Sequence, residues 1–146
     1  MKDLLVLGWR EWVSLPELGL SQIKAKVDTG ARTSALHAFQ LSPFIKNGAQ
    51  HIEFLMHPKQ QNTETVVPCV ARAIDRRTVT DSGGHREERW VIETQLVIGD
   101  HTWPIEVTLT QRDNMRFRML IGRTALTGRA LVDSAKSYQV GRKRRR

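Results

Sequence analysis

The sequence of 146 residues contains one cysteine, Cys69, and no long apolar run. A single thiol excludes an intrachain disulfide and is typical of a reducing compartment, so we expect a cytoplasmic protein. The apolar run near the start, Leu4 to Leu7, is far too short for a signal-peptide core or a membrane span. The sequence therefore predicts no export signal and no membrane partner.

Motifs for metal and nucleotide chemistry are also missing. The chain has no His-Glu-x-x-His and no paired Cys-x-x-Cys, and nothing reads Gly-x-x-x-x-Gly-Lys, the pattern that holds phosphates. Five histidines are scattered along the sequence, at His37, His51, His57, His85 and His101. We expect no metal site, no cofactor and no ATP site in this chain.

Acidic residues are outnumbered, with 15 Asp and Glu against 23 Lys and Arg. Five of the positive charges are consecutive, from Arg142 to Arg146, and the rest of the chain carries 18 basic residues, a net charge of +3. Such a run is most often a solvated tail. The length fits one domain, so we expect a single domain over residues 1–138 and a basic tail over residues 139–146.

Short runs that alternate apolar and polar residues predict an all-β fold. These runs are Leu4–Gly8, Gly8–Val13, Ile23–Val27, His51–His57, Thr65–Val70, Trp90–Ile98 and His101–Leu109. Gly99-Asp100 suits a type II′ hairpin turn between the last two. Two segments, Ser34–Phe39 and Thr124–Arg129, are expected to form short helical turns. Many short strands are typical of a barrel or a sandwich.

One segment carries chemistry: a strand that ends in Asp28-Thr29-Gly30. Two carboxylates held about 3 Å apart cannot both ionise, so they share a proton and can activate a water to attack a peptide carbonyl. Asp28 would be one such carboxylate, Thr29 would fix the paired loops, and Gly30 would bring backbone amides close. The alternative is an ordinary surface turn capped by Asp28.

A second element, Met119–Leu126, places two apolar residues before Gly122-Arg123. With the run Lys26–Ala38 and the segment Ser82–His85, it makes the chain resemble a bacterial retropepsin-like aspartic peptidase family, often labelled putative ATP-dependent zinc protease. The resemblance covers residues from about Gly8 to Val132. It implies a closed acid-protease β-barrel with one or two short helices.

The resemblance also implies a homodimer, because each chain supplies one Asp28 and the catalytic pair needs two. The apolar pair before Gly122 would pack beneath the catalytic loop. The hairpin Val79–Arg86 would form a flap over the substrate, the alternative being an ordinary hairpin loop. We expect substrate contacts from Ala31, Arg32, Gly83, Gly84, His85 and Arg123.

The chain departs from viral retropepsins at Arg32, where they carry an acidic residue that pairs with the arginine corresponding to Arg123. Arg123 then needs another partner, such as Asp113 or Asp133, or both arginines point into the cleft and recognise an acidic substrate. The second hypothesis fits the family's association with enzymes that add glutamate tails to a ribosomal protein. It predicts a glutamate-rich peptide substrate and a ribosomal association.

Two other functions stay open. The chain could be a catalytically idle module of this fold that binds acidic peptides or ribosomal partners through Arg32, Arg123 and the tail. It could also be a small basic nucleic-acid-binding barrel. The second is disfavoured because only Trp90 lies near an arginine cluster, which is too little for a base-stacking platform.

Overall fold

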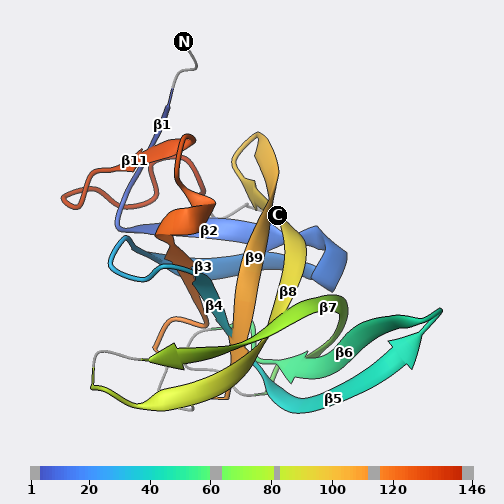
Figure 1. The fold of residues 1–146 in the computed structure, drawn as a ribbon. Helices are drawn as coiled ribbons and strands as arrows, with labels where there is room; N and C mark the ends of the chain where they lie inside the picture. The colour runs from blue at the N-terminus through green and yellow to red at the C-terminus, as the bar shows by residue number, and fades with distance from the viewer. Residues whose placement is uncertain (1–3, 60–63, 81–82, 112–115, 143–146) are drawn as a thin grey trace.

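The computed structural model describes residues 4–59, 64–80, 83–111 and 116–142 (Figure 1). Its strands are β1 (Leu5–Leu7), β2 (Arg10–Leu15), β3 (Leu20–Asp28), β4 (Ser34–His37), β5 (Phe39–Lys46), β6 (Ala49–Met56), β7 (Val67–Thr80), β8 (Arg86–Ile98), β9 (His101–Thr110), β10 (Met119–Gly122) and β11 (Ala130–Val132). Two single 3₁₀ turns, η1 (Pro16–Leu18) and η2 (Arg123–Ala125), accompany them. The predicted all-β class is confirmed.

Nine strands form one sheet in the order β2-β3-β10-β4-β9-β8-β7-β6-β5. Ser14 of β2 also pairs with Val97 of β8, which closes the first six strands of that order into a barrel. Strands β7, β6 and β5 continue from β8 and project from the barrel (Figure 1). The predicted closed β-barrel is therefore present, with an additional hairpin, β5–β6, of which the sequence patterns indicated β6, as the run His51–His57, but not β5.

Alternate residues of the barrel strands point into the core. On β8 these are Ile92, Leu96 and Ile98, and β9 contributes Trp103 and Val107. This alternation follows the two-residue period of a strand, in which successive side chains lie on opposite faces of the sheet. The opposite face of β8 and β9 is consequently available for polar side chains.

The expected helical turn over Ser34–Phe39 is wrong. This segment forms β4 and the start of β5, and β4 pairs with β9 on one side and β10 on the other. Sheet hydrogen bonds on both edges outweigh the weak local preference of so short a segment. The second expected helix, Thr124–Arg129, is present only as η2 followed by turn residues that run through Arg129, in which Gly128 has a φ of 77°. Gly99 has a φ of 59°, as a type II′ turn requires.

The segment expected to begin the basic tail is hydrogen-bonded to the barrel. The backbone N–H groups of Gln139, Val140 and Gly141 donate to the carboxylate of Glu11 on β2. A Cβ on Gly141 would collide with the carbonyl oxygen of Trp12, so this segment lies directly against β2. Residues 139–141 thus belong to the folded unit, and residues 143–146 lie outside the described part of the chain.

Candidate active site

Asp28 is the last residue of β3, and strands on both sides hold this end of β3. On one side β10 runs parallel to β3, with Gly122 in register with Asp28. On the other side β2 pairs with β3, and the N–H of Val27 donates to the carbonyl oxygen of Trp9 at 2.8 Å. The position of the Asp28 backbone is therefore fixed by three strands.

The residues after Asp28 form a tight turn around its carboxylate. The N–H of Gly30 donates to Asp28 Oδ1 at 3.0 Å, and the N–H of Ala31 donates to the Asp28 carbonyl oxygen at 3.2 Å. A Cβ on Gly30 would lie 3.2 Å from Oδ1, closer than most side chains tolerate. Asp28 is half-buried, and Thr29 and Gly30 are exposed in the single chain. The carboxylate thus reaches the surface with most of its acceptor capacity unused by the described residues.

The second motif lies against this loop, as the resemblance implied. The N–H groups of Arg123 and Thr124 donate to the carbonyl oxygens of Ala31 and Arg32 at 2.9 and 3.0 Å. The N–H of Gly122 donates to Ser34 Oγ at 3.0 Å. A Cβ on Gly122 would lie 2.5 Å from the Thr33 carbonyl carbon, so only glycine permits this approach. The two motifs are about 90 residues apart in the sequence and form one structural unit.

The two arginines of the loop differ in their surroundings but both reach the surface. Arg123 Nη1 donates to the carbonyl oxygen of Gly30 at 3.3 Å. Among the described residues no ion pair joins Arg123 to Asp133, which instead accepts a hydrogen bond from the N–H of Ala135. The other suggested partner, Asp113, lies outside the described residues. Arg32 and Arg123 are therefore both exposed, and the Arg123 guanidinium contacts the turn that follows Asp28.

The expected flap corresponds to the tip of the β7–β8 hairpin. Gly83, Gly84 and His85 are exposed there, and Gly84 has a φ of 82° that favours glycine. Asp81 and Ser82 of the same hairpin lie outside the described residues. The substrate contacts expected of Gly83, Gly84 and His85 stay predictions.

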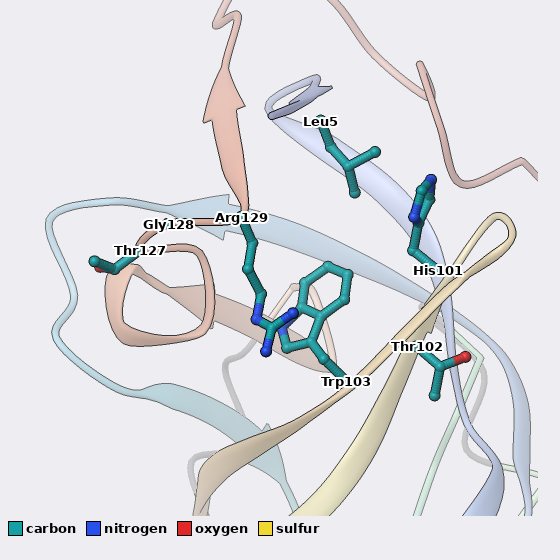
Figure 2. Close-up of a pocket in the computed structure, with 7 residues that line it drawn as sticks. All are labelled: Leu5, His101, Thr102, Trp103, Thr127, Gly128 and Arg129. Atoms are coloured by element: carbon teal, nitrogen blue, oxygen red, sulfur yellow. The ribbon is translucent and has the colours of Figure 1, made fainter. Parts of the chain in front are cut away.

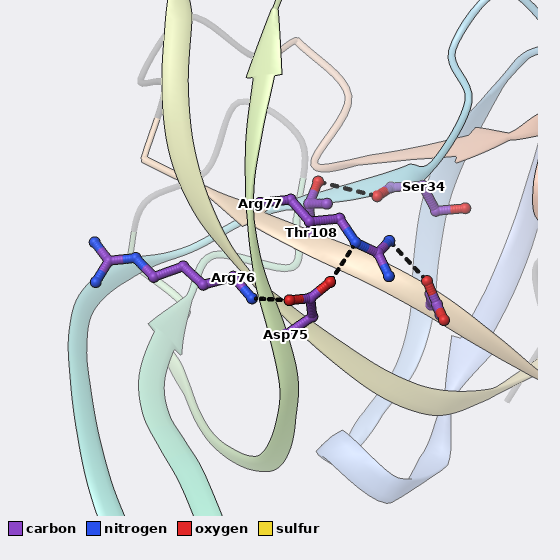
Figure 3. A network of polar contacts seen from close by, with 6 residues as sticks. Ser34, Asp75, Arg76, Arg77 and Thr108 are labelled. Carbon is purple, nitrogen blue, oxygen red and sulfur yellow. Dashed lines mark hydrogen bonds and ion pairs between the residues drawn. The ribbon is translucent and has the colours of Figure 1, made fainter.

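A polar network that the sequence did not indicate joins this hairpin to the loop. The hydroxyl of Thr108 on β9 donates to the carbonyl oxygen of Ser34 at 3.1 Å, which Figure 3 shows beside Arg77 of β7. Arg89 of β8 donates from Nη1 to Thr108 Oγ1 at 3.4 Å. Alternation on the strands could have placed Thr108 and Arg89 on one face, but it does not reveal their contacts.

Other chemical groups are poorly placed for catalysis. Burial raises the pKa of the Cys69 thiol to about 11, so the thiol is neutral and a weak nucleophile at ordinary pH. No group of three or more His, Cys, Asp and Glu side chains in the described ranges could hold a metal ion. No described helix is long and apolar enough to cross a membrane.

A cavity of about 310 Å³ lies at another place, between β1, β9 and the turn after η2 (Figure 2). Its lining consists of Leu5, His101, Thr102, Trp103, Thr127, Gly128 and Arg129. The Arg129 guanidinium lies 5.2 Å from the Trp103 ring centroid and forms one wall. The cavity contains none of the residues of the Asp28 loop, so it is separate from the candidate active site.

A closed six-stranded barrel with an Asp-Thr-Gly loop braced by a Gly-Arg strand is the retropepsin-like fold of aspartic proteases. A family model described as "Retropepsin-like aspartic endopeptidase RimB" matches residues 6–143. The chain belongs to this RimB-like family, which confirms the resemblance seen in the sequence.

Curated relatives carry a different name. The chain is 48% identical over 141 residues to a "Probable alpha-L-glutamate ligase" of Parasynechococcus marenigrum (strain WH8102), covering 97% of this chain and 30% of that protein. A protein of the same name from Shewanella halifaxensis (strain HAW-EB4) is 42% identical over 136 residues, covering 93% and 30%. The chain thus spans about a third of the length of these relatives.

A solved structure agrees with the fold. The crystal structure of a protein of unknown function from Legionella pneumophila subsp. pneumophila str. Philadelphia 1 matches with a TM-score of 0.80. The two share 22% of their residues, and the match covers 94% of this chain and 98% of the other. At this identity the likeness supports the fold and nothing further.

Proposed function

We propose that the chain is an aspartic endopeptidase that acts as a homodimer, with Asp28 of each copy forming the catalytic pair. The observation that carries this proposal is the Asp28 loop. Its carboxylate accepts one N–H at 3.0 Å, from Gly30, and is half-exposed at the end of a strand held on both sides. A carboxylate that served only to cap a turn would not need a second motif braced against its loop.

The chemistry requires two copies because each chain has one Asp-Thr-Gly. Two facing Asp28 carboxylates share a proton, so one takes a proton from a water while the other donates one to the peptide carbonyl oxygen. The backbone bonds of Gly30, Ala31 and Arg123 keep each carboxylate in place during these transfers. The reaction uses only water and the peptide.

The substrate proposed is an acidic, glutamate-rich peptide, such as a glutamate tail on a ribosomal protein. Arg32 and Arg123 are exposed, Arg123 contacts the Gly30 carbonyl oxygen, and their guanidinium groups suit carboxylate side chains. The relatives named as glutamate ligases contain a segment like this chain, which supports a substrate made of glutamate. A cytoplasmic location remains part of the same proposal.

The same two arginines would also allow a module that binds acidic peptides without cleaving them. Peptide hydrolysis at pH 3 to 8 by the parent protein and by Asp28→Asn separates the two functions. We expect the parent to cleave glutamate-rich peptides, insensitive to chelators and with specific activity that rises with protein concentration as dimers form. Binding without cleavage by either protein, at concentrations where the parent is dimeric, would favour the binding module.

A further inference from the structure

Arg89 is a buried cation outside the hydrophobic core. It is 8% exposed and lies on β8, on the face opposite to the core residues Ile92 and Leu96. Arg77 of β7 is its partner in the strand register and shares this face. Charged side chains are seldom buried without a partner, because taking the charge out of water costs several kcal/mol, on the order of the protein's whole stability. The burial of the Arg89 guanidinium therefore indicates a role beyond packing.

Hydrogen bonds connect Arg89 to the catalytic loop in three steps. Arg89 donates to Thr108 Oγ1 at 3.4 Å, and Thr108 donates to the Ser34 carbonyl oxygen at 3.1 Å. Ser34 Oγ accepts from the N–H of Gly122, which is in register with Asp28. A chain of hydrogen bonds thus links Arg89 to Gly122, the residue beside Asp28 in the sheet.

The present partner of Arg89 is itself a glutamate. Arg89 Nε donates to Glu87 Oε2 at 3.2 Å, and the hydroxyl of Thr110 donates to the same carboxylate at 3.2 and 3.3 Å. These bonds are long for charge-assisted ones, which are about 2.7–2.9 Å. The Glu87 side chain is 36% exposed, so its carboxylate can move away from Arg89 and be hydrated by solvent instead. Among the described residues, Arg89 uses two of the five N–H groups that an arginine carries.

We propose that Arg89, with Thr108 beside it, determines specificity by binding the γ-carboxylate of a glutamate side chain in the peptide held at Asp28. The substrate carboxylate takes the place of Glu87, whose side chain turns out to solvent. This inference rests on the proposed function, because it assigns the acidic subsite of that same cleft. Glu87 then acts as an internal competitor that keeps the guanidinium compensated while the site is empty.

The test compares peptides that differ only by Glu or Gln at one position beside the scissile bond. We expect the parent protein to prefer the Glu peptide by about 10-fold or more in kcat/KM, since a neutral amide cannot replace the Glu87 carboxylate as the charged partner of Arg89. Arg89→Gln should lower this preference to within about 3-fold, because kcat/KM falls for the Glu peptide and stays unchanged for the Gln peptide. The double variant that combines Arg89→Gln with Glu87→Gln, and so keeps the net charge, should behave in the same way. Equal loss on both peptides would show a structural role and overturn the inference.

Arg76 provides the matched control. It lies next to Arg77 on β7 but on the other face, with its guanidinium 5.0 Å from the Trp90 ring centroid and 3.5 Å from Glu88. Arg76→Gln should keep the full preference for Glu. Glu87→Gln should act in the opposite direction, lowering KM for the Glu peptide and leaving that of the Gln peptide unchanged. This single variant keeps the inference falsifiable if the Arg89 variants do not fold, because a Glu87→Gln protein with unchanged KM values would overturn it.

Binding measurements separate this inference from the proposed function. Fluorescence anisotropy with labelled Glu and Gln peptides can be done on Asp28→Asn, with and without Arg89→Gln. Discrimination that depends on Arg89, without cleavage by the parent, would support the subsite and refute the peptidase. Cleavage whose Glu preference survives Arg89→Gln would support the peptidase and refute the subsite.

Discussion

Glu11 and Asp28 are carboxylates on the neighbouring strands β2 and β3, and the fold surrounds them in opposite ways. Glu11 is fully buried and accepts four backbone N–H groups, from Gly8, Gln139, Val140 and Gly141, at 2.6–2.9 Å. Asp28 is half-buried and accepts one, from Gly30. A carboxylate with all its lone pairs occupied holds the chain together, whereas one with unused lone pairs can bind a water. The difference lies in the number of N–H groups aimed at each side chain.

Changing the two carboxylates to amides should separate stability from activity. Glu11→Gln replaces one acceptor oxygen by an NH₂ group that faces N–H donors, so we expect the free energy of unfolding to fall by about 3 kcal/mol. Asp28→Asn should change it by less than about 1 kcal/mol while peptide cleavage is lost. Urea unfolding followed by fluorescence measures both stability changes, and peptide hydrolysis measures the loss of cleavage.

Glu88→Gln is the control for this pair, because the Glu88 side chain is 65% exposed and its pairing with Arg76 is a surface contact. Its unfolding free energy should match the parent within about 0.5 kcal/mol. A Glu11→Gln protein as stable as this control would show that the Glu11 carboxylate does not stabilise the packing of residues 139–141 against β2.

A smaller effect is expected where the catalytic loop meets β10. Gly122→Ala would place a Cβ 2.5 Å from the Thr33 carbonyl carbon, so the loop must shift, at a cost of about 1–3 kcal/mol. If the proposed homodimer forms, the shift should also reduce kcat, because the two Asp28 carboxylates of that dimer would no longer face each other correctly. Thermal unfolding and peptide hydrolysis measure the two effects.

Gly48→Ala is the matched glycine control. Gly48 lies in the distant β5–β6 hairpin with a φ of 76°, and a Cβ added there would meet no atom within 4 Å. The substitution should cost about 1–2 kcal/mol through backbone strain and leave kcat unchanged. Equal loss of kcat in both variants would contradict a special role for the contact at Gly122.

The smallest effect concerns a third carboxylate, Asp75, which lies on the surface of β7 (Figure 3). Its hydrogen bond from the Arg77 side chain, and a second from the N–H of Arg76, hold the pKa of Asp75 below its usual value. A lowered pKa in the folded state stabilises the protein above the usual aspartate pKa, and this contribution is lost as the pH falls through the lowered value.

Asp75→Asn should therefore melt slightly below the parent at pH 7, and the gap should close as the pH falls into the range where aspartate is protonated. Melting temperatures from pH 7 down to about pH 2 measure it. A gap that widens in acid would have the wrong sign and would exclude this contribution of the Asp75–Arg77 contact.

These carboxylates also show how far the sequence could predict the site. Asp28 was found because Asp-Thr-Gly is a local pattern, and Gly122-Arg123 because its residues are contiguous. Glu11 was seen only as part of an alternating strand, since three of its four partners are 128–130 residues away and all four are backbone groups without a sequence signature. Arg89 was missed for a similar reason, because its partner Thr108 on β9 becomes a neighbour only through strand register.

The hydrogen bonds of Glu11 also determine how much of the chain must be synthesised before the domain can finish folding. The strand that carries Glu11 is made early, but its carboxylate has partners in residues 139–141 and cannot be fully satisfied until these leave the exit tunnel. Contacts between such distant residues form slowly, because a long loop must close before they contribute any stability. A nascent chain shorter than this point would lack three of the four donors of Glu11, so water would have to hydrate this carboxylate until residues 139–141 pack against β2.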